Sequence, residues 1–65
     1  MSITVNGEPR NLPPGGTVTD LAAALGLPGS GIAIAVDGAV VPRGAWGTML
    51  ADGAVVEVVT AVQGG

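Results

Sequence analysis

The side chains of this 65-residue chain offer little chemistry of their own. The sequence has no histidine, cysteine, lysine or tyrosine, so acid–base catalysis near neutral pH would depend on carboxylates alone. Its two serines, Ser2 and Ser30, have no histidine to activate them as nucleophiles. We therefore predict that the chain is not an enzyme, and that any chemistry is done on it by another protein.

Ligand-binding motifs are also incomplete. The stretch PPGGTVTD at 13–20 has no lysine and does not match a Walker loop, and GSGIAI at 29–34 lacks the third glycine of a dinucleotide fingerprint. Five acidic residues stand against Arg10 and Arg43, a net charge of −3, whereas nucleic-acid binding needs a basic surface. We expect no bound cofactor, no metal and no nucleic acid.

The remaining reactive group is the carboxylate after the final residues, AVQGG. Two glycines without side chains make a thin, permissive segment, and residues 62–65 span ~13 Å when extended. Such a tail can reach into a narrow partner site. There, ATP can convert the carboxylate to an acyl-adenylate, which a sulfur donor can displace to leave a thiocarboxylate. The alternative is a frayed terminus with no function.

The elements that would present this tail begin with a hairpin. Alternating apolar residues precede Asn6-Gly7, the strongest short signal for a type I′ turn. We expect strands at about Ser2–Val5 and Pro9–Leu12. Because Pro9 lacks a backbone donor, the second strand should lie at the edge of a sheet.

One short helix is expected next. Thr17 is a suitable N-cap, and Asp20 completes a capping box. Gly26 suits the position after the helix, and Pro28 prevents its continuation. Such a short helix must pack on a sheet to be stable. Its apolar face consists of Val18, Leu21, Ala22 and Leu25.

Three further strands follow the helix. Asp37-Gly38 predicts a second hairpin between strands at Ile32–Val36 and Ala39–Val41. Residues 44–47 indicate a turn or a single 3₁₀ turn. The last strand is expected at about Ala54–Val62, where a valine-rich run with little alternation is typical of a central strand buried on both faces.

The predicted order is β-β-α-β-β-β, an α+β chain with a mixed sheet packed on one helix. The best match is a β-grasp, the ubiquitin-like fold, with the first and last strands adjacent and parallel. We expect a single domain over residues 1–65 with a flexible tail at 62–65. No secretory signal and no apolar run near 20 residues is visible, so we expect a soluble, cytoplasmic monomer without a membrane segment.

Several stretches of the chain are typical of one protein family. They are ITVNG at 3–7, TVTDL at 17–21, AVDG at 35–38, VVPR at 40–43, Trp46, LADG at 50–53, VEVV at 56–59 and AVQGG at 61–65. With these stretches the sequence resembles the sulfur carrier of bacterial thiamine biosynthesis, the ThiS family. The resemblance covers nearly the whole chain.

The resemblance implies a carrier function. An E1-like adenylyltransferase would use ATP to adenylate Gly65, and a sulfur donor such as a cysteine desulfurase would supply sulfur for its thiocarboxylate. Thiazole synthase would then receive that sulfur for the thiazole ring of thiamine. Val62, Gln63 and Gly64 would form the tail that threads into these partners.

Alternatives remain open at the level of residues and of function. Trp46 either covers the small core or anchors a partner, and Arg43 is either a solvated turn residue or a contact for a partner's acidic group. Relatives often carry acidic residues at the positions of Ala45 and Ala54. We expect that this chain therefore lacks a surface charge at each of these positions. The alternative functions are a sulfur carrier for another pathway, such as molybdopterin synthesis, and a non-catalytic ubiquitin-like binding module.

Overall fold

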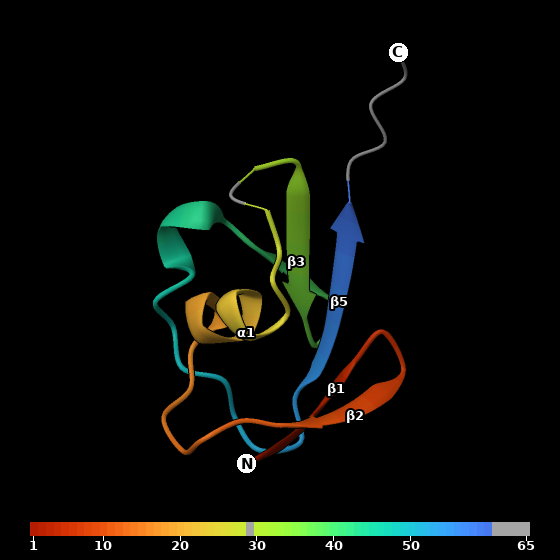
Figure 1. Cartoon of the computed structure of the whole chain (residues 1–65), viewed down its shortest axis with the longest axis vertical. Helices are drawn as coiled ribbons and strands as arrows, with labels where there is room; N and C mark the ends of the chain where they lie inside the picture. The colour runs from red at the N-terminus through yellow and green to blue at the C-terminus, as the bar shows by residue number, and fades with distance from the viewer. Residues whose placement is uncertain (29, 61–65) are drawn as a thin grey trace.

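A computed structural model describes residues 1–28 and 30–60 of the chain. Five strands form one mixed sheet in the order β2-β1-β5-β3-β4, and helix α1 lies across one of its faces (Figure 1). The β-β-α-β-β-β order is the expected one. The elements are β1 (Ser2–Val5), β2 (Glu8–Asn11), α1 (Val18–Ala24), β3 (Ile32–Val36), β4 (Ala39–Val41), the 3₁₀ turn η1 (Arg43–Ala45) and β5 (Val55–Thr60).

The first hairpin forms at the predicted turn. Asn6 and Gly7 have φ values of 49° and 83°, and positive φ at both positions is what a type I′ turn requires. β2 begins one residue earlier than expected, because a two-residue turn places Glu8 opposite Val5. Pro9 lies on the outermost strand, which confirms its predicted edge position.

β5 is the central strand and joins the two halves of the sheet. It pairs in parallel with β1 and antiparallel with β3, so the predicted adjacency of the first and last strands is confirmed. The expectation that β5 is buried on both faces is wrong. Val56 is fully buried, but Val55 and Val59 are 49% and 60% exposed. The reason is that the one helix of the described residues covers one face of the sheet. Residues 61 and 62 lie outside the described residues.

Both ends of α1 are capped as the sequence predicts. The Thr17 hydroxyl accepts from the Asp20 backbone N–H at 3.1 Å, and the Asp20 carboxylate accepts from the Thr17 N–H at 3.0 Å. This is a capping box. After the helix, Gly26 has a φ of 66° and the Leu27 N–H donates to the Ala22 carbonyl at 3.0 Å. That bond is part of a Schellman motif, so a seven-residue helix is fixed at both ends.

The segment that follows β4 anchors the start of α1. The backbone N–H of Thr19 donates to the carbonyl of Trp46 at 3.0 Å, and that of Val18 donates to Thr48 at 3.4 Å. These are N–H groups of the first helical turn, which have no partner inside a helix. An irregular segment without apolar periodicity therefore holds the helix against the sheet. Among the described residues, no helix is long and apolar enough to cross a membrane.

The core lies between α1 and the covered face of the sheet. Val18, Leu21 and Ala22 of the predicted helical face are buried, and Leu25 packs against them. Ala54 is 3% exposed, so it is a core residue and the expectation of a lost surface charge there is wrong. The full set of buried side chains is Ile3, Val5, Leu12, Val18, Leu21, Ala22, Ile34, Trp46, Leu50, Ala54 and Val56.

Candidate functional site

The structure shows the strand that leads to the proposed reactive tail. Within the described part of the chain β5 runs to Thr60, and its end lies far from the N-terminus, toward the opposite pole of the molecule (Figure 1). The four residues predicted to form the acceptor and the threading tail, Val62, Gln63, Gly64 and Gly65, lie outside the described residues.

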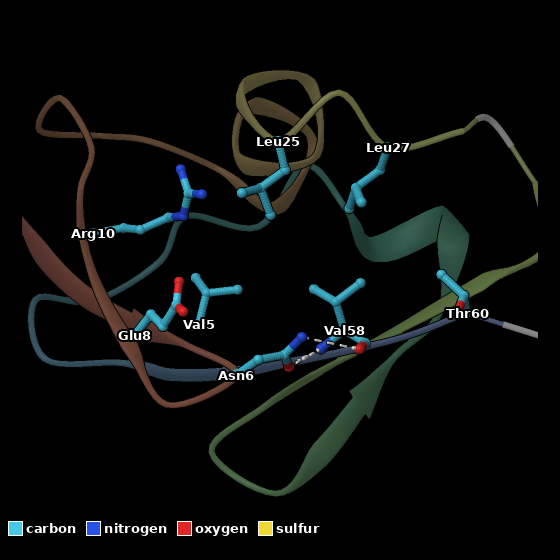
Figure 2. A pocket seen from close by; sticks show the side chains of 8 residues that line it. All are labelled: Val5, Asn6, Glu8, Arg10, Leu25, Leu27, Val58 and Thr60. Atoms are coloured by element: carbon cyan, nitrogen blue, oxygen red, sulfur yellow. Dashed lines mark hydrogen bonds between the residues drawn. The ribbon is translucent and has the colours of Figure 1, made fainter.

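The last part of β5 is held on both of its edges. On one edge β3 pairs with it up to Ile32 opposite Thr60. On the other edge β1 has already turned away, and the side chain of Asn6 takes its place (Figure 2). The Asn6 amide oxygen accepts from the Val58 N–H at 2.8 Å, and its NH₂ group donates to the Val58 carbonyl at 3.3 Å. The sequence predicted the turn at Asn6 but not this contact.

A groove lies beside this end of β5, between β2 and the residues that follow α1 (Figure 2). Its apolar lining includes Leu25, Leu27 and Val58, while Glu8 and Arg10 approach from β2. Both charged side chains are exposed, and none of the polar side chains described is buried.

Arg43 and Trp46, the two predicted partner contacts, lie together. The Arg43 guanidinium carbon is 4.2 Å from the centroid of the Trp46 ring, a cation–π arrangement. Trp46 is only 7% exposed and its ring N–H donates to the Val41 carbonyl at 3.1 Å. Of the two roles considered for Trp46, burial supports the covering of the core. Arg43 is exposed, and its guanidinium group lies over the Trp46 ring.

The open face of the sheet carries exposed apolar side chains. Val40 is 69% exposed, and the strand register places it in one row with Ala35 and Glu57. Val55 and Val59 lie on the same face of β5 as Glu57, since side chains alternate along a strand. Sequence reasoning missed this surface because it expected both faces of β5 to be covered.

No catalytic or metal-binding constellation forms among residues 1–28 and 30–60. In those ranges no group of three acidic side chains is close enough to bind a metal ion. Two of the acids instead bond to backbone groups distant in the sequence: Asp52 accepts from the Ser2 N–H at 2.7 Å and Asp37 from the Val55 N–H at 2.9 Å. These two carboxylates therefore hold the backbone at the starts of β1 and β5.

Comparisons with known proteins agree with this picture. The model of the ThiS family matches residues 3–65. A crystal structure of the thiamine biosynthesis protein (ThiS) from Geobacter metallireducens is similar over 100% of both chains, with 31% sequence identity and a TM-score of 0.78. A solution structure of a thiamine biosynthesis protein from the same organism has 32% identity and a TM-score of 0.76, over 100% of this chain and 88% of that one. No curated protein sequence matched significantly.

Proposed function

This chain belongs to the ThiS family of β-grasp proteins, which act as sulfur carriers in thiamine biosynthesis and are not catalysts, and we propose that it carries its sulfur as a thiocarboxylate on Gly65. The family match extends through the Gly-Gly end, to residue 65. That match carries the proposal. It is supported by the sequence, which has no cysteine or lysine, and by the described residues, among which no group of acidic side chains could hold a metal ion.

The proposed loading takes two steps. First, a carboxylate oxygen of Gly65 attacks the α-phosphorus of ATP; the bond to the β-phosphate bridging oxygen breaks and pyrophosphate leaves. Second, a sulfide nucleophile attacks the acyl carbon, the bond from that carbon to the bridging oxygen breaks, and AMP leaves with this oxygen. One oxygen of the carboxylate is thereby exchanged for one sulfur. Both steps take place on a partner, because neither an ATP-binding motif nor a catalytic base is present in the sequence.

We infer three partners for this chemistry. An E1-like adenylyltransferase would supply the ATP site, and a sulfur donor such as a cysteine desulfurase would supply the sulfide equivalent. Thiazole synthase would be the acceptor of the sulfur. Gly64, Gln63 and Val62 would enter the partner sites with Gly65, since a segment without large side chains fits a narrow channel. Arg43, exposed over Trp46, would meet an acidic group of one partner.

Intact-mass spectrometry tests the proposal. The chain is incubated with a purified E1-like adenylyltransferase of the thiamine pathway, ATP and sodium sulfide, and the products are fragmented. The expected product gains one sulfur and loses one oxygen at Gly65, and its formation requires ATP. Sulfur on an internal residue, or no change in the presence of an enzyme that loads a control carrier, would contradict the proposal.

A second candidate function is a binding module that acts through the sheet. The observation that favours it is the set of exposed apolar side chains on the open face, where Val40 is 69% and Val59 is 60% exposed. A module of that kind would bind its partner whether or not the tail is intact. Truncation after Thr60 distinguishes the two functions, because it abolishes sulfur loading in a carrier but leaves the binding of a sheet-face partner unchanged.

A further inference from the structure

Asn6 extends one edge of the central strand by a side chain instead of a backbone. The backbone bonds between β1 and the β5 segment include those from the Thr4 N–H to the Ala54 carbonyl and from the Asn6 N–H to the Val56 carbonyl, each 2.9 Å. The chain then reverses at the Asn6-Gly7 turn. The next position along this edge is Val58, and both of its backbone groups bond to the Asn6 amide instead.

The amide group suits this position because it both donates and accepts. The backbone N–H of Asn6 is bonded to Val56, and it is the side chain of Asn6 that bonds to both backbone groups of Val58. A carboxamide presents one carbonyl and one NH₂ group, much as a peptide unit does. Asn6 has a φ of 49°, a conformation that asparagine tolerates better than most residues.

Asp37, in the second turn, makes a similar side-chain contact with the backbone at the opposite end of β5. Asp37 has a φ of 50° and is followed by Gly38, as Asn6 is followed by Gly7. Its carboxylate accepts from the Val55 N–H at 2.9 Å, while its own N–H donates to the Val55 carbonyl at 2.7 Å. At this position the side chain needs only to accept, because the backbone N–H of Asp37 already donates to the Val55 carbonyl. Asp37 therefore holds the start of β5, and Asn6 holds it near its end.

We propose that Asn6 is a positioning residue for sulfur loading, and that its contact with Val58 directs the end of β5 toward the activating partner. The proposal rests on the function given above. Gly65 lies seven positions after Val58, a span of at most ~23 Å, so the contact holds the strand at the base of the segment that carries the carboxylate. A reacting group that is misplaced by about 1 Å can lose much of its rate.

Without Asn6, Val58 keeps its antiparallel pairing with Ile34 and loses its bonds on the other edge. The strand would then be ordered by one neighbour over its last residues, and the partner would have to order it during the reaction. We expect the cost to appear mainly in kcat. The expected loss is about tenfold, which corresponds to ~1.4 kcal/mol, the order of the net value of one or two hydrogen bonds.

The test compares Asn6→Gly with Asp37→Gly in the full-length chain. Glycine accepts the positive φ of both turns, so neither variant strains the backbone. Each loses side-chain bonding to β5 and gains freedom when unfolded, so their melting temperatures should fall by similar amounts. The probe reaction is adenylation of the chain by the purified E1-like adenylyltransferase with ATP. Its rate is measured as pyrophosphate release at several concentrations of the chain.

For Asn6→Gly we expect faster hydrogen exchange at the Val58 amide, a kcat about tenfold lower, and a KM within about twofold of the unaltered chain. For Asp37→Gly we expect both constants to stay unchanged. Equal kcat values for the two variants would overturn the proposal. If the unaltered chain itself releases no pyrophosphate, the proposed function fails and this proposal fails with it, so the two failures are distinguishable.

Asn6→Asp gives a second test, which does not depend on the folding of the glycine variant. The carboxylate can still accept from the Val58 N–H, but it cannot donate to the Val58 carbonyl and instead faces it as a second acceptor. Its kcat should lie between those of the unaltered chain and Asn6→Gly. A kcat equal to that of the unaltered chain would show that the donor half of the contact does not position the strand.

Discussion

The indole N–H of Trp46 donates a hydrogen bond to the carbonyl oxygen of Val41 at a distance of 3.1 Å. The bond joins the end of β4 to the segment that follows η1. Trp46 also accepts, through its backbone carbonyl, from the N–H and the hydroxyl of Thr19 in α1. This residue therefore connects the edge of the sheet, the irregular segment and the start of the helix.

We predict that Trp46→Phe lowers the free energy of unfolding by about 1–3 kcal/mol. Phenylalanine keeps an aromatic ring in the core and under Arg43 but has no donor for the Val41 carbonyl, and it leaves a small gap. Denaturant unfolding followed by circular dichroism measures the change. A variant as stable as the unaltered chain would show that the bond adds nothing to the packing of the ring.

Leu21→Ala should be more damaging. Leu21 is fully buried between α1 and the sheet, and core leucine-to-alanine changes cost about 2–5 kcal/mol. A 65-residue domain has roughly 3–10 kcal/mol of stability in total. The matched control is Val59→Ala on the open face, where the side chain is 60% exposed and the cost should stay within about 0.5 kcal/mol. Thermal melting of both variants checks the expectation, and equal melting temperatures would refute the assignment of the core.

The capping box gives a prediction with its own rescue. Asp20→Ala removes the acceptor for the Thr17 N–H at the start of α1 and should cost about 0.5–2 kcal/mol. Asp20→Asn keeps an acceptor oxygen at the same place, so it should recover most of the loss. Denaturant midpoints of the two variants provide the measurement. If Asp20→Asn is as unstable as Asp20→Ala, the charge near the helix start is what stabilises it, not the hydrogen bond.

Local features were predictable from the sequence because their causes lie within a few residues. The Asn6-Gly7 and Asp37-Gly38 turns require positive φ, and both form where the dipeptides occur. The caps of α1 follow in the same way from Thr17, Asp20 and Gly26. The parallel pairing of the first and last strands was predictable at the level of topology, since one helix on a mixed sheet leaves few arrangements.

Features that depend on distant partners were not predictable. The valine run of β5 does not indicate which face is covered, and only the placement of α1 shows that Val59 is exposed while Val56 is buried. The contact between Asn6 and Val58 joins residues 52 positions apart and depends on the register of β5 against β1. The burial of Ala54 likewise follows from its position just before β5 and not from any local period.

The predicted tail and acceptor, residues 62–65, lie outside the described residues. Their proposed role is supported by the sequence and by the family match, which extends to residue 65. Their test is a single substitution, Gly64→Val, which places a branched side chain one residue before the proposed reacting carboxylate. The control is Gly47→Val. A side-chain carbon at Gly47 would meet nothing within 4 Å, and this residue precedes β5 by several positions.

The most direct measurement is the rate at which each variant forms a thiocarboxylate with the E1-like adenylyltransferase, ATP and sulfide, followed by intact-mass spectrometry. If the tail threads into a site that excludes side chains, Gly64→Val should be slower by about a hundredfold or more at an unchanged melting temperature, because the carboxylate can no longer reach its reacting position. Gly47→Val should react at the rate of the unaltered chain. Normal loading of Gly64→Val would contradict the central claim that this protein carries sulfur on a threaded C-terminal glycine.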